Sequence, residues 1–417
     1  MRLKLTGLWQ HADFLRLWSG QTISVFGSMI GGTALSFTAI LFLKATPFQL
    51  GVLSSMQIVP ALLAGLFAGA WVDRLQRRPL LIGADIGRTL VLASLPLSAL
   101  LGMLRIGQVY VVALLVSILT IIFDVAYQAY LPGLVGKDEL VEGNSKLSAS
   151  AAVAEFGGFS IAGWLVQALT APFAILIDVA SFAVSAITLG LIRSREAAVI
   201  TEEQPDMYRE IGNGLQAVWQ HALLRAITAA VFVENLAGGM FGALVVLYMS
   251  RGLGFNPGIL GMIWAVGGVS SFAGAAFAPR LTRRIGPGRL MIAGLAIFGL
   301  SQMFIPLASG ASLLSAAFLI IQQTGDGFFT VYEINRVSLV QGLGRVNATI
   351  RFLGLGAALL GALLGGLLGE TLGVRGTLVM GACGTLLAAL ALAASPLRSL
   401  KQPAEKGELD ALQFPGE

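Results

Sequence analysis

Long apolar runs alternate with short polar segments along almost the whole chain. Each run is about as long as the roughly 20 residues that a helix needs to cross a bilayer core. A backbone inside a bilayer finds no water, so runs of this length predict helices rather than barrel strands. We therefore expect an all-α polytopic membrane protein with twelve transmembrane helices. Their approximate bounds are 17–43, 48–72, 79–104, 107–131, 147–168, 172–192, 224–249, 257–279, 288–308, 312–335, 348–369 and 373–396.

The composition supports the same fold class. The 417-residue chain is 56% hydrophobic, its mean hydropathy is +0.82 and only 12% of its residues are charged. A soluble chain carries about 25% charged residues. The 52 glycines are typical of membrane helices that approach one another closely. The first residues read as a basic amphipathic lead-in rather than as a cleavable signal peptide.

Basic residues gather on one side of the predicted membrane. If both termini are cytoplasmic and the helices alternate in direction, all but five of the 27 Lys and Arg residues fall on the inner side. The exceptions are Lys44, Arg105, Arg251 and Arg375 in outer loops and Arg88 inside the third run. The positive-inside rule favours this orientation. We expect a multi-pass protein of the bacterial cytoplasmic membrane with both termini in the cytoplasm.

The chain is predicted to contain two similar six-helix halves. Six runs precede the long polar insert and six follow it, and the loop "DRLQRR" (73–78) has a counterpart in "PRLTRR" (279–284). Duplicated halves predict a substrate site at their interface and alternating access by rocking of the halves. The expected domains are an N-terminal bundle over 1–192, a cytoplasmic linker over 193–223, a C-terminal bundle over 224–397 and a cytoplasmic tail over 398–417.

The loop after the second run resembles the signature of the major facilitator superfamily. That signature reads G-x-x-x-D-R-x-G-R-R/K, with Gln76 standing here for its second glycine; the matching residues are Gly69, Asp73, Arg74, Arg77 and Arg78. Three further segments resemble the drug-efflux branch that includes macrolide exporters and enterobactin-type siderophore exporters. These segments are "FDVAYQAYLPGLV" (123–135), "ILIDVASF" (175–182) and "GRVNATIRFLGLG" (344–356).

The resemblance implies two pseudo-symmetric bundles and secondary active transport. We expect proton-coupled efflux, by antiport, of small hydrophobic or amphiphilic compounds such as drugs. In the family the aspartate of the motif latches the cytoplasmic side in one conformation, which implies a gating role for Asp73. The alternative is that Asp73 only pairs with Arg74 or Arg77. We expect Arg77 and Arg78 to anchor the topology rather than to bind substrate.

Three acidic residues near the middle of predicted helices are candidates for proton coupling, namely Glu155, Asp326 and Glu234. A charge at mid-bilayer costs about 2.5–3.5 kcal/mol, so each needs a partner or a role. Burial disfavours the ionised form of a carboxyl group, so such acids can exchange protons. The alternative is a permanently protonated acid that bonds to a neighbouring helix. Asp85 and Arg88 lie one turn apart and are expected to pair.

Polar and aromatic side chains inside the predicted helices are candidates for the substrate cavity. They are Gln21, Tyr127, Asn235, Gln322, Gln323, Phe329, Arg88 and Arg351. An adaptable apolar wall suits hydrophobic drugs. Arginines facing the cavity would suit a siderophore or another anion, whereas acids there would suit a cationic drug. Each aromatic residue taken alone can equally face lipid or another helix.

The sequence offers no pattern typical of other function classes. It has no G-x-x-x-x-G-K-[ST], H-E-x-x-H or G-x-S-x-G motif. Its single cysteine lies in the last apolar run, and its two histidines lie outside the predicted spans. We expect no enzyme activity, no cofactor and no metal, with the proton gradient as the energy source. The expected partners are a small-molecule substrate and membrane lipid, without nucleic acid, and the chain is expected to be a monomer. Export of a siderophore or a lipid-like metabolite, or a passive channel, remain alternatives.

Overall fold

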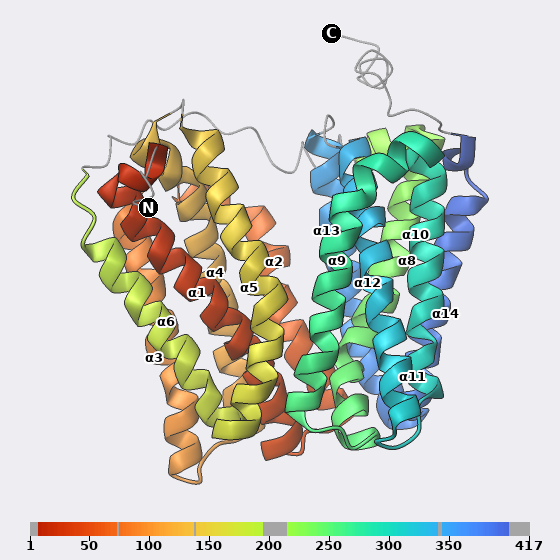
Figure 1. The fold of residues 1–417 in the computed structure, drawn as a ribbon, viewed down its shortest axis with the longest axis horizontal. Helices are drawn as coiled ribbons and strands as arrows, with labels where there is room; N and C mark the ends of the chain where they lie inside the picture. Colours follow the sequence, from red (N-terminus) through yellow and green to blue (C-terminus); the bar gives the residue numbers. More distant parts are fainter. Residues whose placement is uncertain (1–6, 73–74, 137–138, 195–214, 341–343, 400–417) are drawn as a thin grey trace, which may run out of the picture. The chain divides into compact units, whose positions relative to one another are not determined.

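The computed structural model describes residues 7–72, 75–136, 139–194, 215–340 and 344–399 (Figure 1). The side chains of 64–72, 155–156, 344–345 and 399 lie outside this description. Helices are the only regular elements of the described residues. The predicted all-α fold class is confirmed.

The helices of the first half follow one another with short connections. Their bounds are η1 (Gly7–Gln10), α1 (Ala12–Phe37), η2 (Thr38–Phe42), α2 (Pro47–Val72), α3 (Arg77–Leu100), α4 (Ile106–Val135), α5 (Leu140–Leu169) and α6 (Ala171–Gly190).

The second half repeats this order after a short helical stretch at 215–220. Its helices are α8 (Ala222–Leu247), η3 (Tyr248–Gly252), α9 (Pro257–Ile285), α10 (Pro287–Gln302), α11 (Phe304–Leu307), α12 (Leu313–Val340), α13 (Gly344–Thr371), α14 (Val374–Ala393) and η4 (Pro396–Ser399).

Each of the twelve predicted runs coincides with a helix, and the ninth is divided between α10 and α11 at Met303. Ten of the described helices are long and apolar enough to cross a membrane. The other two are α2, whose side chains are described only as far as Leu63, and α12, which carries several polar residues. The chain is therefore a multi-pass helical membrane protein.

The chain divides into two compact units. Unit 1 comprises residues 1–45, 56–204 and 256–262, and unit 2 comprises residues 46–55, 205–255 and 263–417. The first residues of α2 thus belong to unit 2, and the first residues of α9 belong to unit 1. Each unit contains the start of a helix that continues in the other.

Unit 1 is built around contacts of α1 and α3 with α6. Two glycines of α1 allow the closest approach, because a Cβ at Gly27 would overlap the Ser181 hydroxyl and a Cβ at Gly31 would lie 2.6 Å from Asp178 Cγ. Small residues are the usual means by which membrane helices approach closely. The apolar core of the unit lies near the start of α1, where Phe14 is fully buried.

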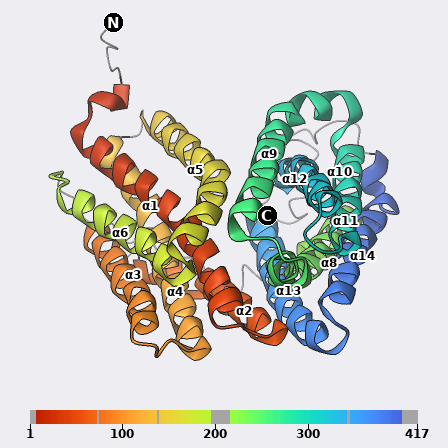
Figure 2. The ribbon, with the colours of Figure 1, turned by 60° about the horizontal axis from the view of Figure 1, so that its bottom comes forward.

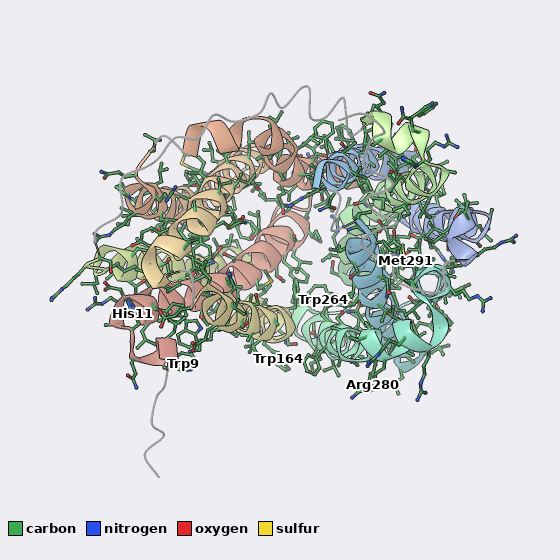
Figure 3. The ribbon with its side chains drawn as sticks, turned by 90° about the horizontal axis from the view of Figure 1, so that it is seen from above. Trp9, His11, Trp164, Trp264, Arg280 and Met291 are labelled. Atoms are coloured by element: carbon green, nitrogen blue, oxygen red, sulfur yellow. The ribbon has the colours of Figure 1, made fainter. Side chains whose placement is uncertain are left out.

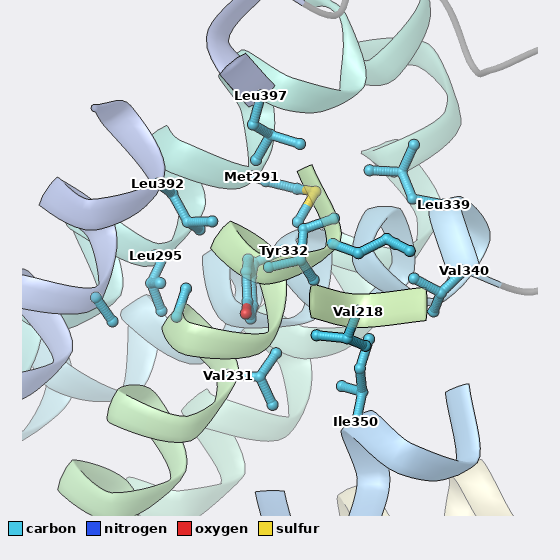
Figure 4. Close-up of a cluster of buried hydrophobic side chains, with 14 of the residues drawn as sticks. Val218, Val231, Met291, Leu295, Tyr332, Leu339, Val340, Ile350, Leu392 and Leu397 are labelled. Atoms are coloured by element: carbon cyan, nitrogen blue, oxygen red, sulfur yellow. The ribbon is translucent and has the colours of Figure 1, made fainter. Parts of the chain in front are cut away.

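Unit 2 is organised by α8, which packs against α13 and α14, and by α10, which packs against α12 and α14. Figure 2 shows α8 and α14 on one side of this unit, with α12 beside α10 and α11. Its largest apolar cluster surrounds Tyr332 of α12, which lies among Val231, Met291 and Leu295 (Figure 4).

The two halves repeat each other in backbone detail. α1 and α8 both end in a π-helical turn, η2 and η3, and each turn is followed by a residue with positive φ, Lys44 (54°) and Gly254 (84°). The junctions before α6 and α14 also match, with Thr170 at φ 65° and Gly373 at φ 82°. A duplicated architecture accounts for such pairs better than chance recurrence of short loops does.

Candidate functional site

The most polar stretch inside a helix of unit 2 lies on α12. Gln322 and Gln323 are each 7% exposed, and Asp326 follows one turn later. The amide Nε2 of Gln322 donates to Asp326 Oδ1 at 3.4 Å. Buried polar groups need hydrogen-bond partners, so these three side chains form one polar cluster on α12.

Helix α9 closes over this cluster through its glycines. A Cβ at Gly267 would lie 2.8 Å from Asp326 Oδ2 and would overlap the amide of Gln323. One turn away, Ser270 Oγ donates to the Thr324 carbonyl oxygen at 2.7 Å and accepts from the Gly327 N–H at 3.2 Å. In the described part of the chain Asp326 has no ion-pair partner, so α9 and α12 hold a carboxyl group among neutral neighbours.

Glu234 of α8 lies in a second polar cluster of unit 2. It is 7% exposed and accepts from Asn235 Nδ2 at 2.8 Å. The same amide donates to the Val231 carbonyl oxygen at 2.9 Å, which fixes its orientation. Glu333 and Arg336 of α12 pair at 2.5 Å, and the charges of both act on Glu234. Glu234 therefore lies near a neutral ion pair rather than beside a cation of its own.

Phe329 and Arg351 take different places in unit 2. Phe329 contacts Phe298 of α10, with ring centroids 4.6 Å apart, and Tyr332, at 5.7 Å. It therefore joins the apolar packing around Tyr332. Arg351 is exposed on α13.

In unit 1, Gln21 of α1 and Tyr127 of α4 carry polar atoms without a partner. Gln21 Oε1 and the Tyr127 hydroxyl are buried and find no hydrogen bond within the described ranges. The Tyr127 ring stacks on Phe123 at 5.9 Å. Leaving a buried polar atom unpaired costs about 1–3 kcal/mol, so both are candidates to bind a solute.

Arg88 lies in the interior of unit 1. It is 3% exposed and forms the expected ion pair with Asp85, which is confirmed. Its guanidinium carbon lies 4.4 Å from the ring centroid of Phe123 and 4.1 Å from that of Phe182. Contacts with two aromatic faces stabilise a buried cation.

The loop motif is described in part. Asp73, Arg74 and the side chain of Glu155 lie outside the described residues, and Gly69 belongs to the last turns of α2. Arg78 donates from Nε to the Leu189 carbonyl oxygen at 3.1 Å and from Nη2 to that of Gly190 at 2.7 Å. These carbonyls end α6, where a cation is favoured by the helix dipole.

Two further clusters were not singled out by the sequence analysis as functional. Beside the start of α1, Lys146 Nζ of α5 lies 4.2 Å from the ring centroid of Trp9 in η1, which Figure 3 labels. Glu142 of α5 accepts from the Leu8 N–H and from Lys146 Nζ, at 3.2 and 2.6 Å. The second surrounds Asp178 of α6, which is 4% exposed. Ser28 of α1, which faces Asp178, was the sequence signal for this second cluster. A serine in an apolar run points to such a cluster only once α1 is known to pack against α6.

Comparison with known proteins gives consistent matches. The chain is 26% identical over 315 residues to an uncharacterized MFS-type transporter, YfiS, of Bacillus subtilis, covering 72% of this chain and 71% of that protein. It is 24% identical over 245 residues to macrolide efflux protein A of Streptococcus pyogenes, covering 57% of this chain and 60% of that protein.

Solved structures share the fold at low identity. The nucleoside transporter NupG superposes with a TM-score of 0.72 at 16% identity, covering 92% of this chain and 98% of that one. A bacterial homologue of the iron transporter ferroportin superposes with a TM-score of 0.73 at 16% identity, covering 92% and 99%. The family model of the Major Facilitator Superfamily matches residues 17–348, and the chain therefore belongs to this superfamily.

Proposed function

We propose that the chain is a secondary active transporter that exports small hydrophobic or amphiphilic compounds, such as drugs, in exchange for protons. Asp326 carries the proposal, because its half-buried carboxyl group lies between α9 and α12 with only neutral partners among the described residues. The similarity to macrolide efflux protein A supports a drug-like substrate.

The proposed chemistry is competition between a proton and the substrate. An ionised carboxylate in this setting needs a cation, whereas the protonated acid is neutral and can stay enclosed. Glu234 and Glu155 are proposed as further coupling acids. The proton that enters from outside would neutralise the acid in one access state, and the membrane potential adds about 2.3 kcal/mol per charge per 100 mV.

Polar residues of each unit are proposed to orient the substrate. Gln322 and Gln323 offer amide donors and acceptors, and Gln21 and Tyr127 have unpaired polar atoms. Asn235 can reorient only by releasing Glu234. We propose that the protein lies in a bacterial cytoplasmic membrane with both termini inside, that bundles 1–192 and 224–397 rock during transport, and that it acts as a monomer without cofactor.

Transport by purified protein in lipid vesicles tests the proposal. An imposed proton gradient should drive accumulation of cationic dyes or macrolides, and Asp326→Asn should abolish the response to the gradient. Glu139→Gln is the matched control, since Glu139 is an exposed carboxyl group at the start of α5. Full gradient-driven transport by Asp326→Asn would refute the coupling role.

Counterflow separates a transporter from a passive channel. A preloaded unlabelled substrate should accelerate uptake of the labelled compound from the other side, whereas a channel gives no such stimulation. A siderophore panel in the same vesicles tests the alternative cargo. Preference for an anionic siderophore, lost in Arg351→Gln, would replace the drug assignment.

A further inference from the structure

We propose that Asp178 on α6 is a proton-binding site of unit 1, separate from the acids of α8 and α12. Its part in transport rests on the proposed function, but proton binding itself does not. The carboxyl group of Asp178 binds a proton that it can exchange, and it binds no other ligand.

The hydrogen bonds around Asp178 favour the protonated acid. Ser181 Oγ lies 2.8 Å from the main-chain carbonyl oxygen of Asp178 and 3.2 Å from its Oδ1. A serine hydroxyl has one proton to donate, and the shorter contact to the carbonyl uses it. The contact at 3.2 Å is then satisfied if the carboxyl group supplies the hydrogen and Ser181 Oγ accepts it.

The other contacts of Asp178 are too weak to hold a carboxylate. Ser28 Oγ of α1 lies 3.4 Å from Oδ1, which is a long hydrogen bond. Oδ2 lies directly against the backbone of Gly31, so α1 shields this oxygen from water. An ionised carboxylate usually accepts several hydrogen bonds at its two oxygens.

No free cation within the described ranges compensates Asp178. Among the described residues it has no ion pair, and the charge that reaches it is that of Arg88, which already pairs with Asp85. Asp124 acts on the same guanidinium. Three carboxyl groups therefore share one cation, and ionising all of them in the interior would leave two negative charges unbalanced.

The Asp85–Arg88 pair also has unused hydrogen-bonding capacity. Asp85 Oδ2 and Arg88 Nε are buried and without a partner in the described ranges, and the fully buried Ser185 of α6 lies beside Asp85. Arg88 can therefore respond to a second anion without first breaking other bonds. Loss of the proton from Asp178 would draw the guanidinium toward α6 and weaken its ion pair with Asp85.

The charged groups that surround Asp178 are few. α3 contributes Asp85 and Arg88, and α4 contributes Asp124 through Arg88. The other described charges beside α6 lie at its C-terminal end, where Arg78 of α3 bonds to the last carbonyls and Asp13 and Arg16 of α1 pair with each other. The described charges of α5, Glu142 and Lys146, pair with each other at its start. Of the described charges, those of the Asp85–Arg88 pair should thus act on the protonation of Asp178.

Infrared difference spectroscopy of the full-length protein in lipid vesicles tests the proposal without requiring transport. A protonated carboxyl group gives a C=O band apart from carboxylate bands, and this band shifts in heavy water. We expect one such band to disappear in Asp178→Asn and to persist in the matched variant Asp124→Asn. Raising the pH should remove the same band reversibly in the unsubstituted protein.

Two outcomes would overturn the proposal. If Asp178→Asn leaves every protonated-carboxyl band in place, Asp178 is ionised; if the band persists until the protein unfolds, the proton does not exchange. Should Asp178→Asn fail to fold, Ser181→Ala decides, since removing the acceptor should shift the Asp178 band, and an unshifted band refutes the proton placement. Asp326→Asn must leave this band intact even if it abolishes coupled transport, which separates the two proposals.

Discussion

At the scale of single residues, the two halves place different residue types in the same backbone conformation. Thr170 adopts φ 65° and ψ 156°, a region that is almost restricted to glycine, while its counterpart Gly373 adopts φ 82° and ψ 151°. A non-glycine residue in such a region costs about 1–3 kcal/mol. Thr170 is thus a strained residue at an exposed junction.

Thr170→Gly is expected to stabilise unit 1 by about 1 kcal/mol, because relief of strain exceeds the roughly 0.5–1 kcal/mol entropic cost of glycine. Unfolding by denaturant in detergent micelles measures the change. Gly373→Thr is the reciprocal control and should destabilise, since no atom lies within 4 Å of its added Cβ and only the backbone strain changes. Equal stability of both variants and the unsubstituted protein would contradict the argument.

A second prediction concerns the glycines of α1. Gly31→Ala should destabilise by about 1–3 kcal/mol, since the added methyl group meets Asp178 and overpacking of a tight contact has costs of this size. Gly32→Ala is its matched control, because no atom lies within 4 Å of that position. Thermal unfolding should separate the neighbours, and equal melting temperatures would mean that α1 shifts freely from α6.

At the scale of helices, α9 and α12 are joined by backbone contacts rather than by long side chains. Cβ atoms at Gly274 and Gly327 would meet the backbone of the opposite helix. The hydroxyl of Ser270 connects to the backbone of α12 at two positions. The position of the half-buried Asp326 between α9 and α12 therefore depends on a narrow glycine and serine contact.

Ser270→Ala is expected to loosen this contact. The change leaves the Thr324 carbonyl and the Gly327 N–H without their present partner, at a cost of about 1–3 kcal/mol. Amide exchange of α12 near Gly327, followed by mass spectrometry, should accelerate. Ser250→Ala serves as the control, since that hydroxyl bonds only within its own helical segment, and unchanged exchange in Ser270→Ala would show that the glycines alone hold the helices.

The apolar pattern was enough to predict helices but not their partners. Each predicted run became a helix because length and hydropathy are local properties, and Asp85 and Arg88 could be paired because they share one helix face. The setting of Asp178 depends on Ser28 and Gly31, which lie about 150 residues away. Contacts of this kind depend on helix packing, which no local pattern specifies.

At the scale of the whole molecule, two helix starts are held by side chains from other helices. Gln167 of α5 accepts from the Gly258 N–H at 3.0 Å, and Glu370 of α13 accepts from the Phe48 N–H at 3.4 Å. Both amides are the second residues of their helices, α9 and α2. Free N–H groups at a helix start need such acceptors.

Gln167→Leu should expose the start of α9. Loss of a bond that contributes about 1 kcal/mol predicts roughly fivefold faster amide exchange at Gly258. Glu370→Gln, which keeps an acceptor on α13, should leave exchange at Phe48 nearly unchanged. Protection of Gly258 that survives Gln167→Leu would assign the stability of this start to the close approach of Gly163 and Gly261 instead.

The matched π-turns η2 and η3 have a consequence for how this protein can be engineered. Their side chains differ almost completely, "TAILF" against "YMSRG", yet both lead into a left-handed residue and a proline-initiated helix. The two copies thus share the backbone bend and not the side chains that form it. Either π-turn can therefore replace the other in a chimaera, because the backbone at the graft site already has the same conformation in both halves.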